Sequence, residues 1–229
     1  MVEVDRVMIE DYGIELIQMM ENAGRNLAHL ARIRFMEGDP RGREVIVLVG
    51  SGGNGGGALV AARRLHNWGA RITVATTRPP DELSGVPARQ AEIVTNMGIQ
   101  IVTADSLDSL TSCDLIIDGI IGYSLAGVPT GNAALMIEWA NRSTADIVSL
   151  DVPSGMDASA GAVHSPAIKA TATLTLALPK TGLQSGDFQQ YTGELYLADI
   201  SVPPELYGNL PGDLSVGPLF ARDDVLRIC

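Results

Sequence analysis

Three polar turns in this chain carry side chains that could bind a ligand or catalyse a reaction. The first is the glycine-rich run at residues 50–57, the second contains Asp118, and the third contains Asp151. Each turn follows a short apolar segment of the kind that forms a buried strand. In an open parallel sheet, ligands bind beyond the carboxyl ends of the strands. We therefore expect the three turns to meet at one rim of a sheet and to form a single site.

The glycine-rich run reads GSGGNGGG and is expected to connect a strand to a helix. Glycine lets the backbone approach a ligand closely, and the free amides at a helix start attract phosphate groups. The run lacks the Lys-Ser/Thr pair of a Walker loop, and it is not the G-x-G-x-x-G dinucleotide fingerprint with an acid on the next strand. It predicts a phosphate-binding loop, with a flexible glycine turn as the alternative.

The two acidic turns could supply a carboxylate each. Asp118 leaves an apolar strand and is followed by two nearby glycines, which favours a loop folded around a ligand, although a helix cap or turn residue would look the same. Asp151 begins the sequence DVPSG, which places its carboxylate and the hydroxyl of Ser154 around a rigid proline. Such a turn can aim both groups into one cleft, with a plain Asx or Ser/Thr turn as the alternative. A carboxylate on a cleft floor could serve as a general acid or base.

Histidine and cysteine do not indicate a second kind of site. His29, His66 and His164 do not cluster in the sequence, so a zinc site or a Ser-His-Asp triad has little support. Cys113 and Cys229 lie far apart and have no metal-binding spacing. Two isolated cysteines favour a reducing compartment.

Hydrophobic periodicity predicts the elements that position the three turns. Apolar residues recur at helical spacing near the N-terminus, and short β-branched runs alternate with helical patterns further on. The expected helices cover residues 14–35, 58–68, 85–97 and 132–142, and the expected strands cover residues 45–49, 72–75, 99–103, 115–118, 147–151, 172–178 and 194–198. This order predicts an α/β fold, a three-layer sandwich with helices on both faces of a mostly parallel sheet. The last two strands are expected to extend one edge.

The length, amino-acid composition and net charge limit the class of protein to which the chain can belong. The chain has 229 residues, is 46% hydrophobic and 19% charged, and carries a formal net charge of −11. It can bury a sizeable core and fits a single domain over residues 1–229. The acidic balance disfavours nucleic acid as a partner, although backbone dipoles can still hold a small anion. The sequence has no apolar run of about 18 residues and no signal-peptide pattern, so we expect a cytoplasmic protein without a membrane segment.

Taken in order, six stretches of the chain resemble the NAD(P)H-hydrate epimerase family, whose domain is often called YjeF N-terminal. They are MMENAGRNLA at residues 19–28, VGSGGNGGGALVAARRL at 49–65, LIIDGIIGYSLAG at 115–127, SLDVPSGMDA at 149–158, ALPKTGL at 177–183 and GELYLADISVP at 193–203. These stretches span nearly the whole chain in the family's order and spacing. The resemblance implies a Rossmann-like fold, which agrees with the pattern of elements.

The resemblance also implies a reaction. Hydration of NADH or NADPH gives a damaged cofactor that is hydroxylated at carbon 6 of the nicotinamide ring, in two epimers, and the family interconverts them. A separate ATP- or ADP-dependent dehydratase then restores only one epimer. That dehydratase is often fused C-terminally in related chains, and we expect this chain not to contain it. The apolar N-terminal helix could cover the core or make a homodimer.

The family's functional residues carry over to this chain by position. The resemblance implies that Asp151 is the catalytic group and contacts the nicotinamide end, and that a potassium ion binds Asn54, Asp118 and Ser154. A hard monovalent cation held by such oxygens could pin the three turns together. The implied substrate-binding residues are Gly53, Asn54, Gly55, Gly56, Gly57, Gly122, Tyr123, Ser124, Leu125, Ala126, Gly127, Val128 and Asp151.

Three positions depart from the family pattern. The family's glycine loop reads Asn-Asn-Gly-Gly-Asp, and its first and last residues are Gly53 and Gly57 here. Many relatives place a basic residue after Gly-Tyr-Ser-Leu, where this chain has Ala126. The loss of an acid and a base gives a second hypothesis, a catalytically weak nucleotide-binding or scaffold module. Lys180 could be a substitute cation for a phosphate or an ordinary exposed lysine.

Overall fold

The main sheet of the protein has the strand order β10-β9-β8-β5-β4-β1-β2-β3. The computed structural model describes residues 2–110, 112–125, 127–158, 160–184, 188–208, 210 and 215–228. All neighbouring strands in the sheet are parallel except β10, which pairs antiparallel with β9. The stretch from β3 to β8 has the 3-2-1-4-5-6 order of dinucleotide-binding α/β proteins. The strand order reverses beside β1, so the topological switch point lies between β1 and β4.

The strands form where short apolar, mostly β-branched runs occur in the sequence. They are β1 (Glu44–Val49), β2 (Arg71–Thr76), β3 (Gln100–Thr103), β4 (Leu115–Gly119), β5 (Asp146–Leu150), β8 (Ala172–Leu176), β9 (Glu194–Ala198) and β10 (Val225–Arg227), with β6 (Met156–Asp157) and β7 (Ala162–Val163) forming a separate short hairpin. The two late strands β8 and β9 extend one edge of the sheet, as predicted. The hairpin and β10 are too short for a periodic signal, so the sequence pattern did not predict them.

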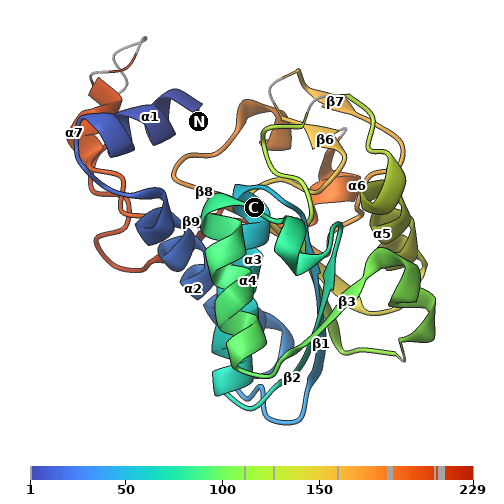
Figure 1. The fold of residues 1–229 in the computed structure, drawn as a ribbon. Helices are drawn as coiled ribbons and strands as arrows, with labels where there is room; N and C mark the ends of the chain where they lie inside the picture. Colours follow the sequence, from blue (N-terminus) through green and yellow to red (C-terminus); the bar gives the residue numbers. More distant parts are fainter. Residues whose placement is uncertain are drawn as a thin grey trace.

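Helices cover both faces of this sheet (Figure 1). On one face pack α2 (Leu16–Phe35), α3 (Gly53–Asn67) and α4 (Gly85–Asn96), and on the other pack α5 (Gly131–Arg142) and the 3₁₀ helix η2 (Ala104–Ser109). Alternation along β1 supplies both cores, because Val45, Val47 and Val49 point to the first face and Ile46 and Leu48 to the second. The predicted three-layer α/β sandwich is confirmed.

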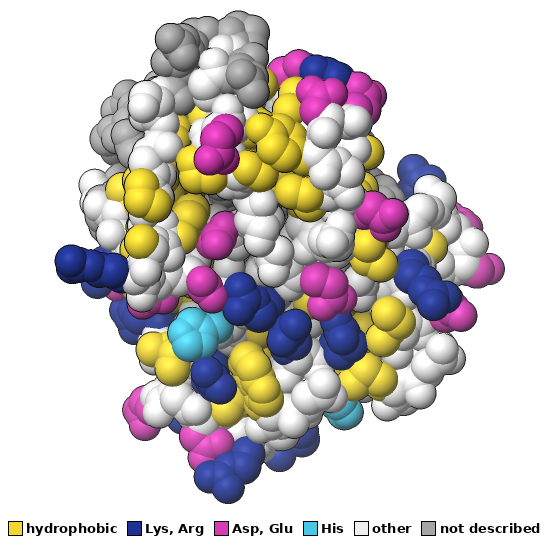
Figure 2. All heavy atoms as spheres, turned by 90° about the vertical axis from the view of Figure 1, so that its left-hand side faces the viewer, with side chains coloured by type: hydrophobic (Ala, Val, Ile, Leu, Met, Phe, Trp, Pro, Cys, Tyr) yellow, Lys and Arg dark blue, Asp and Glu magenta, His cyan; other side chains and the backbone are white. Residues whose placement is uncertain are grey.

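The N-terminal helix α1 (Val2–Glu10) is an element that the sequence analysis missed. It packs beside α7 (Pro204–Gly208) at one end of the molecule (Figure 1). The remaining short helices are α6 (Gln189–Thr192), η1 (Pro80–Glu82) and η3 (Thr181–Gln184). Figure 2 shows the side of the molecule that carries α1 and α7, with hydrophobic side chains grouped in its upper part and basic and acidic ones interleaved below. None of the helices in the described ranges has the length and apolar character needed to cross a membrane.

The start of α3 differs from the prediction. The helix after the glycine run was expected to begin at residue 58, but it begins at Gly53. Glycine costs about 1 kcal/mol relative to alanine inside a helix, which argues for a loop from sequence alone. Close packing explains the glycines of α3, because a Cβ on Gly55 would lie 1.9 Å from the carbonyl oxygen of Gly50 and one on Gly56 would lie 2.5 Å from Sδ of Met20 on α2. On α2, a Cβ on Gly24 would lie 2.4 Å from the carbonyl oxygen of Gly57.

Replacing Gly24 by alanine should therefore destabilise the protein, although alanine is the better helix former. Overpacking of this kind costs about 1–3 kcal/mol of unfolding free energy, because the new methyl group collides with backbone. Urea denaturation monitored by circular dichroism measures the change. Gly217→Ala is the matched control, because its added methyl group meets nothing within 4 Å. A Gly24→Ala variant as stable as wild type would contradict the close α2–α3 packing.

Candidate active site

The first and second predicted turns pack directly on each other at the switch point. The amide of Gly50 donates to the carbonyl oxygen of Gly119 at 3.1 Å. A Cβ on Gly50 would lie 1.8 Å from the carbonyl oxygen of Ile120, and a Cβ on Gly122 would lie 2.4 Å from Oδ1 of Asn54. Only glycine allows these approaches, so the glycines of both turns bring the ends of β1 and β4 into contact.

Asp118 joins the second turn to the third. Its Oδ1 accepts hydrogen bonds from the Ser154 hydroxyl at 2.5 Å and the Ile120 amide at 3.2 Å, and its Oδ2 accepts from the Ser149 hydroxyl at 2.7 Å and the Ser154 amide at 2.9 Å. The carboxyl group is fully buried, and burial raises its pKa. Within the described residues, no basic side chain pairs with Asp118.

Asp151 stands immediately after β5, which ends at Leu150 rather than at Asp151 as predicted. Its backbone has φ 67°, the left-handed region, which aspartate adopts more readily than most residues. Oδ1 of Asp151 forms an ion pair with the ammonium group of Lys180 and accepts a hydrogen bond from the Leu176 amide at 3.3 Å. No partner of its Oδ2 occurs among the described residues.

Lys180 belongs to this site. Its side chain is only 10% exposed and that of Asp151 is 2% exposed. The ammonium group also donates to the carbonyl oxygen of Leu176 at 3.0 Å. The interpretation of Lys180 as an ordinary exposed lysine is therefore wrong: the lysine is the counter-ion of the predicted catalytic carboxylate.

The three turns line a continuous groove. A cavity of 70 Å³ is lined by Asp151, Asn54 and Tyr123, with apolar side chains from α2 beside them. An adjoining cavity of 450 Å³ shares Asn54 and Tyr123 and extends along residues 51–54 and 120–124. A third cavity, also of 450 Å³, shares Ser51 with the second and continues to Arg78 beyond the end of β2. The groove thus follows the carboxyl ends of β5, β4, β1 and β2.

The structure brings together only part of the predicted substrate-binding set. Gly53, Asn54, Gly122, Tyr123, Ser124 and Asp151 line the groove. Among the described residues, Gly55, Gly56 and Gly57 are buried within α3, and Leu125, Gly127 and Val128 are not among the lining residues. Ala126 lies outside the described residues. The substrate-binding roles of all these residues stay predictions.

Asp5 is a groove residue that the sequence analysis missed. It lies on α1 and lines both the 70 Å³ cavity and the adjoining one. The hydroxyl of Tyr123 donates to its Oδ2 at 2.5 Å. Burial raises the pKa of the Asp5 carboxyl, and burial together with the Asp5 carboxylate raises the pKa of Tyr123. The helical spacing of Val4, Val7 and Met8 was a weak signal that could have located α1.

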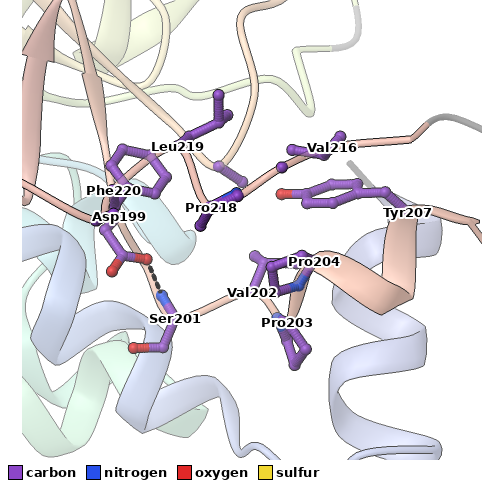
Figure 3. Close-up of a pocket in the computed structure, with 13 residues that line it drawn as sticks. Asp199, Ser201, Val202, Pro203, Pro204, Tyr207, Val216, Pro218, Leu219 and Phe220 are labelled. Atoms are coloured by element: carbon purple, nitrogen blue, oxygen red, sulfur yellow. Dashed lines mark hydrogen bonds between the residues drawn. The ribbon is translucent and has the colours of Figure 1, made fainter.

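A separate cavity of 320 Å³ lies beside α7 and is shown in Figure 3. Its wall is formed largely by Pro203, Pro204 and Pro218 with the rings of Tyr207 and Phe220. The carboxylate of Asp199 in this cavity accepts a hydrogen bond from the Ser201 amide at 2.6 Å. No residue of the predicted site lines it, so it is distinct from the groove.

The strand order and the groove at the switch point define the class of the protein, a Rossmann-like α/β protein with a groove at the carboxyl ends of its strands. The crystal structure of yeast YNL200c has the same fold, with a TM-score of 0.82 over 99% of this chain and 96% of the yeast chain. The two sequences are 24% identical, so this likeness concerns the fold alone.

Sequence comparison identifies the family. The model of the YjeF-related protein N-terminus matches residues 16–182, and the chain belongs to this family. A relative named NAD(P)H-hydrate epimerase from Dehalogenimonas lykanthroporepellens is 43% identical over 90% of this chain and 81% of its own length. Another of that name, from Rhodopirellula baltica, is 34% identical over 89% of this chain and 83% of its own length. The match to the bifunctional NAD(P)H-hydrate repair enzyme Nnr of Moorella thermoacetica, at 34% identity, covers 89% of this chain but 40% of that enzyme.

Proposed function

We propose that this protein is an NAD(P)H-hydrate epimerase, an isomerase that interconverts the two epimers of hydrated NADH and NADPH. The observation that carries the proposal is the cavity at the end of β5. In this cavity the buried carboxylate of Asp151 is paired with Lys180. The cavity opens into a groove that runs past the N-terminus of α3. The names of the relatives support the same activity.

The groove has separate places for the parts of a dinucleotide. In the proposal, the nicotinamide ring enters the 70 Å³ cavity beside Asp151. The diphosphate lies over the first turn of α3, whose N-cap Gly52 provides no side chain to bond the free amides. The adenosine end follows the third cavity towards Arg78. This order matches the direction in which Rossmann-like proteins bind dinucleotides across the switch point.

In the proposal, Asp151 exchanges a proton with the hydroxyl group on carbon 6 of the hydrated ring. Acid–base assistance there promotes loss of the hydroxyl group, or opening of the ring, and its return on the other face. Oδ1 is held by Lys180 and the Leu176 amide, which leaves Oδ2 for the substrate. The ion pair also keeps Asp151 in a fixed position at the cavity wall.

We further propose that a potassium ion binds Asn54, Asp118 and Ser154. The donors fit such an ion, because one carboxylate, one amide oxygen and one hydroxyl suit a hard cation of low charge. Asp118 is fully buried and lacks a basic partner in the described part of the chain, so a cation would neutralise it. The ion would supply positive charge that fixes the three turns and assists binding of the diphosphate.

Potassium should raise the melting temperature relative to choline chloride at equal ionic strength. A ligand at ten times its dissociation constant contributes about 1.4 kcal/mol, which corresponds to roughly 3–5 °C for a domain of this size. Thermal denaturation in the two salts measures the shift. The Asp118→Asn variant should lose the difference between the salts, because it lacks the carboxylate charge. Equal melting temperatures in both salts for the wild-type protein would contradict the potassium site.

The experiment that tests the epimerase proposal starts from one purified epimer of hydrated NADH or NADPH. Chromatography of the two epimers over time should show conversion well above the spontaneous background when the protein is added. If conversion stays at background while ADP-ribose still binds, the second candidate, a catalytically weak nucleotide-binding or scaffold module, takes its place. The observations that favour this second candidate are Gly53 and Gly57 in the glycine run, where an acid and an amide are missing.

Two wider properties belong to the same proposal. A dehydratase acts as pathway partner, as the fusion in the bifunctional repair enzymes of relatives supports. The protein works in the cytoplasm, where the cofactors are used. Homodimer formation stays a prediction, and the apolar face of the predicted N-terminal helix, α2, covers the core.

A further inference from the structure

The helix α1 places one carboxyl group in the groove. Its apolar residues Val4, Val7 and Met8 are buried in a small core with Leu206 and Tyr207 of α7. This packing anchors α1 through its apolar residues. Asp5 stands on the remaining side of the helix and lines the 70 Å³ cavity together with Asp151.

The surroundings of Asp5 couple it to the proposed catalytic pair. Its Oδ2 accepts the hydrogen bond from Tyr123, while Oδ1 has no partner among the described residues. The charge of Asp151 raises the pKa of Asp5 and the charge of Lys180 lowers it, so both groups lie within electrostatic reach. The two carboxyl groups enter the cavity from different elements, Asp151 from the end of β5 and Asp5 from α1.

We propose that Asp5 is the second proton-transfer group of the epimerisation and acts on the ring face opposite to Asp151. This inference rests on the proposed function. Interconversion of two epimers at one carbon needs proton transfer on both faces of the ring, and a single carboxylate can reach only one face without moving. The cavity wall supplies a second carboxyl group where the reaction requires one.

The two carboxyl groups and one water molecule account for every proton and electron pair in the epimerisation. On one face, the carbon 6–oxygen bond breaks, the departing oxygen takes a proton from the protonated carboxyl group, and water leaves. The electron pair of the ring nitrogen then forms a double bond to carbon 6. On the other face, water adds to carbon 6 and gives a proton to the second carboxylate. The two carboxyl groups have exchanged protonation states, and the reverse reaction uses them in opposite roles.

The Asp5→Asn variant distinguishes a role of Asp5 in proton transfer from a role in holding α1 in place. Asparagine keeps an oxygen that accepts the Tyr123 hydrogen bond, so α1 stays in place. We expect kcat to fall by about 100-fold or more, within the range of general acid–base catalysis, and KM and the Kd for ADP-ribose to change less than about twofold. Tyr123→Phe removes the hydrogen bond but keeps the carboxyl group, and its kcat should fall less. Glu10→Gln, on the exposed part of the same helix, is the control with unchanged kcat.

Chemical rescue provides a second readout. Formate should restore a measurable part of the turnover of Asp5→Ala, because it can supply the missing carboxylate in the enlarged cavity, whereas it cannot replace a structural contact. The proposal is overturned if Asp5→Asn retains more than half of the wild-type kcat, or if formate has no effect on Asp5→Ala while that variant still binds ADP-ribose. Failure of the proposed function itself is distinguishable, because the wild-type protein would then show no turnover.

Discussion

Replacing Asp151 by asparagine should lower kcat for epimerisation by about 10²–10⁴-fold, the usual contribution of a general acid or base. Asparagine adopts the left-handed backbone region as readily as aspartate does, so the turn after β5 should keep its shape. The change removes the charge that pairs with Lys180 and the group that exchanges protons with the substrate. Initial rates on a single purified epimer measure the effect.

A surface aspartate gives the control for this variant. Asp108→Asn alters a side chain that is 84% exposed on η2 and lines none of the three groove cavities, and it should leave the rate unchanged. The two variants should bind ADP-ribose equally well. An Asp151→Asn protein that turns over within about threefold of the wild-type rate would remove Asp151 from the chemistry, since acid–base roles are worth at least about 10²-fold.

Removing the carboxylate of Asp118 should have the largest effect on stability. Asp118→Ala leaves the buried amides of Ser154 and Ile120 without an acceptor, and each such group costs about 1–3 kcal/mol. The free energy of unfolding should therefore fall by about 3 kcal/mol or more. Urea titration followed by circular dichroism and by tryptophan fluorescence measures it.

The control is a second variant at position 108, Asp108→Ala. A substitution of an exposed side chain changes the free energy of unfolding by about 0.5 kcal/mol or less. The loss should appear as a lower denaturation midpoint with an unchanged slope. Equal midpoints for wild type and Asp118→Ala would mean that the hydrogen bonds between the second and third turns do not hold them together.

Local patterns were sufficient to predict the layers of the fold. Short apolar, β-branched runs such as 45–49 and 115–117 favour strands covered on both faces, and the structure has them at the centre of the sheet. The start of α3 could not be predicted in this way, because the low helix propensity of glycine is outweighed by packing against Gly24 and Met20, which lie on α2.

The site was predictable where its residues follow strands and not where they come from elsewhere. The turns that carry Asn54, Asp118 and Ser154 meet because the ends of β1, β4 and β5 are neighbours in a parallel sheet. Asp5 lies 118 positions before its partner Tyr123, and no local pattern connects the two. The burial of Lys180 likewise depends on its contact with Asp151, which only the folded chain provides.

A crystal structure of the protein with bound NADP⁺ would show directly which way a dinucleotide lies in the groove. We expect the nicotinamide ring in the cavity between Asp151 and Asp5, the diphosphate over the first turn of α3, and the adenosine end towards Arg78. A dinucleotide bound in the opposite direction, with its nicotinamide ring beside Arg78, or bound in the separate cavity beside α7, would contradict this expectation.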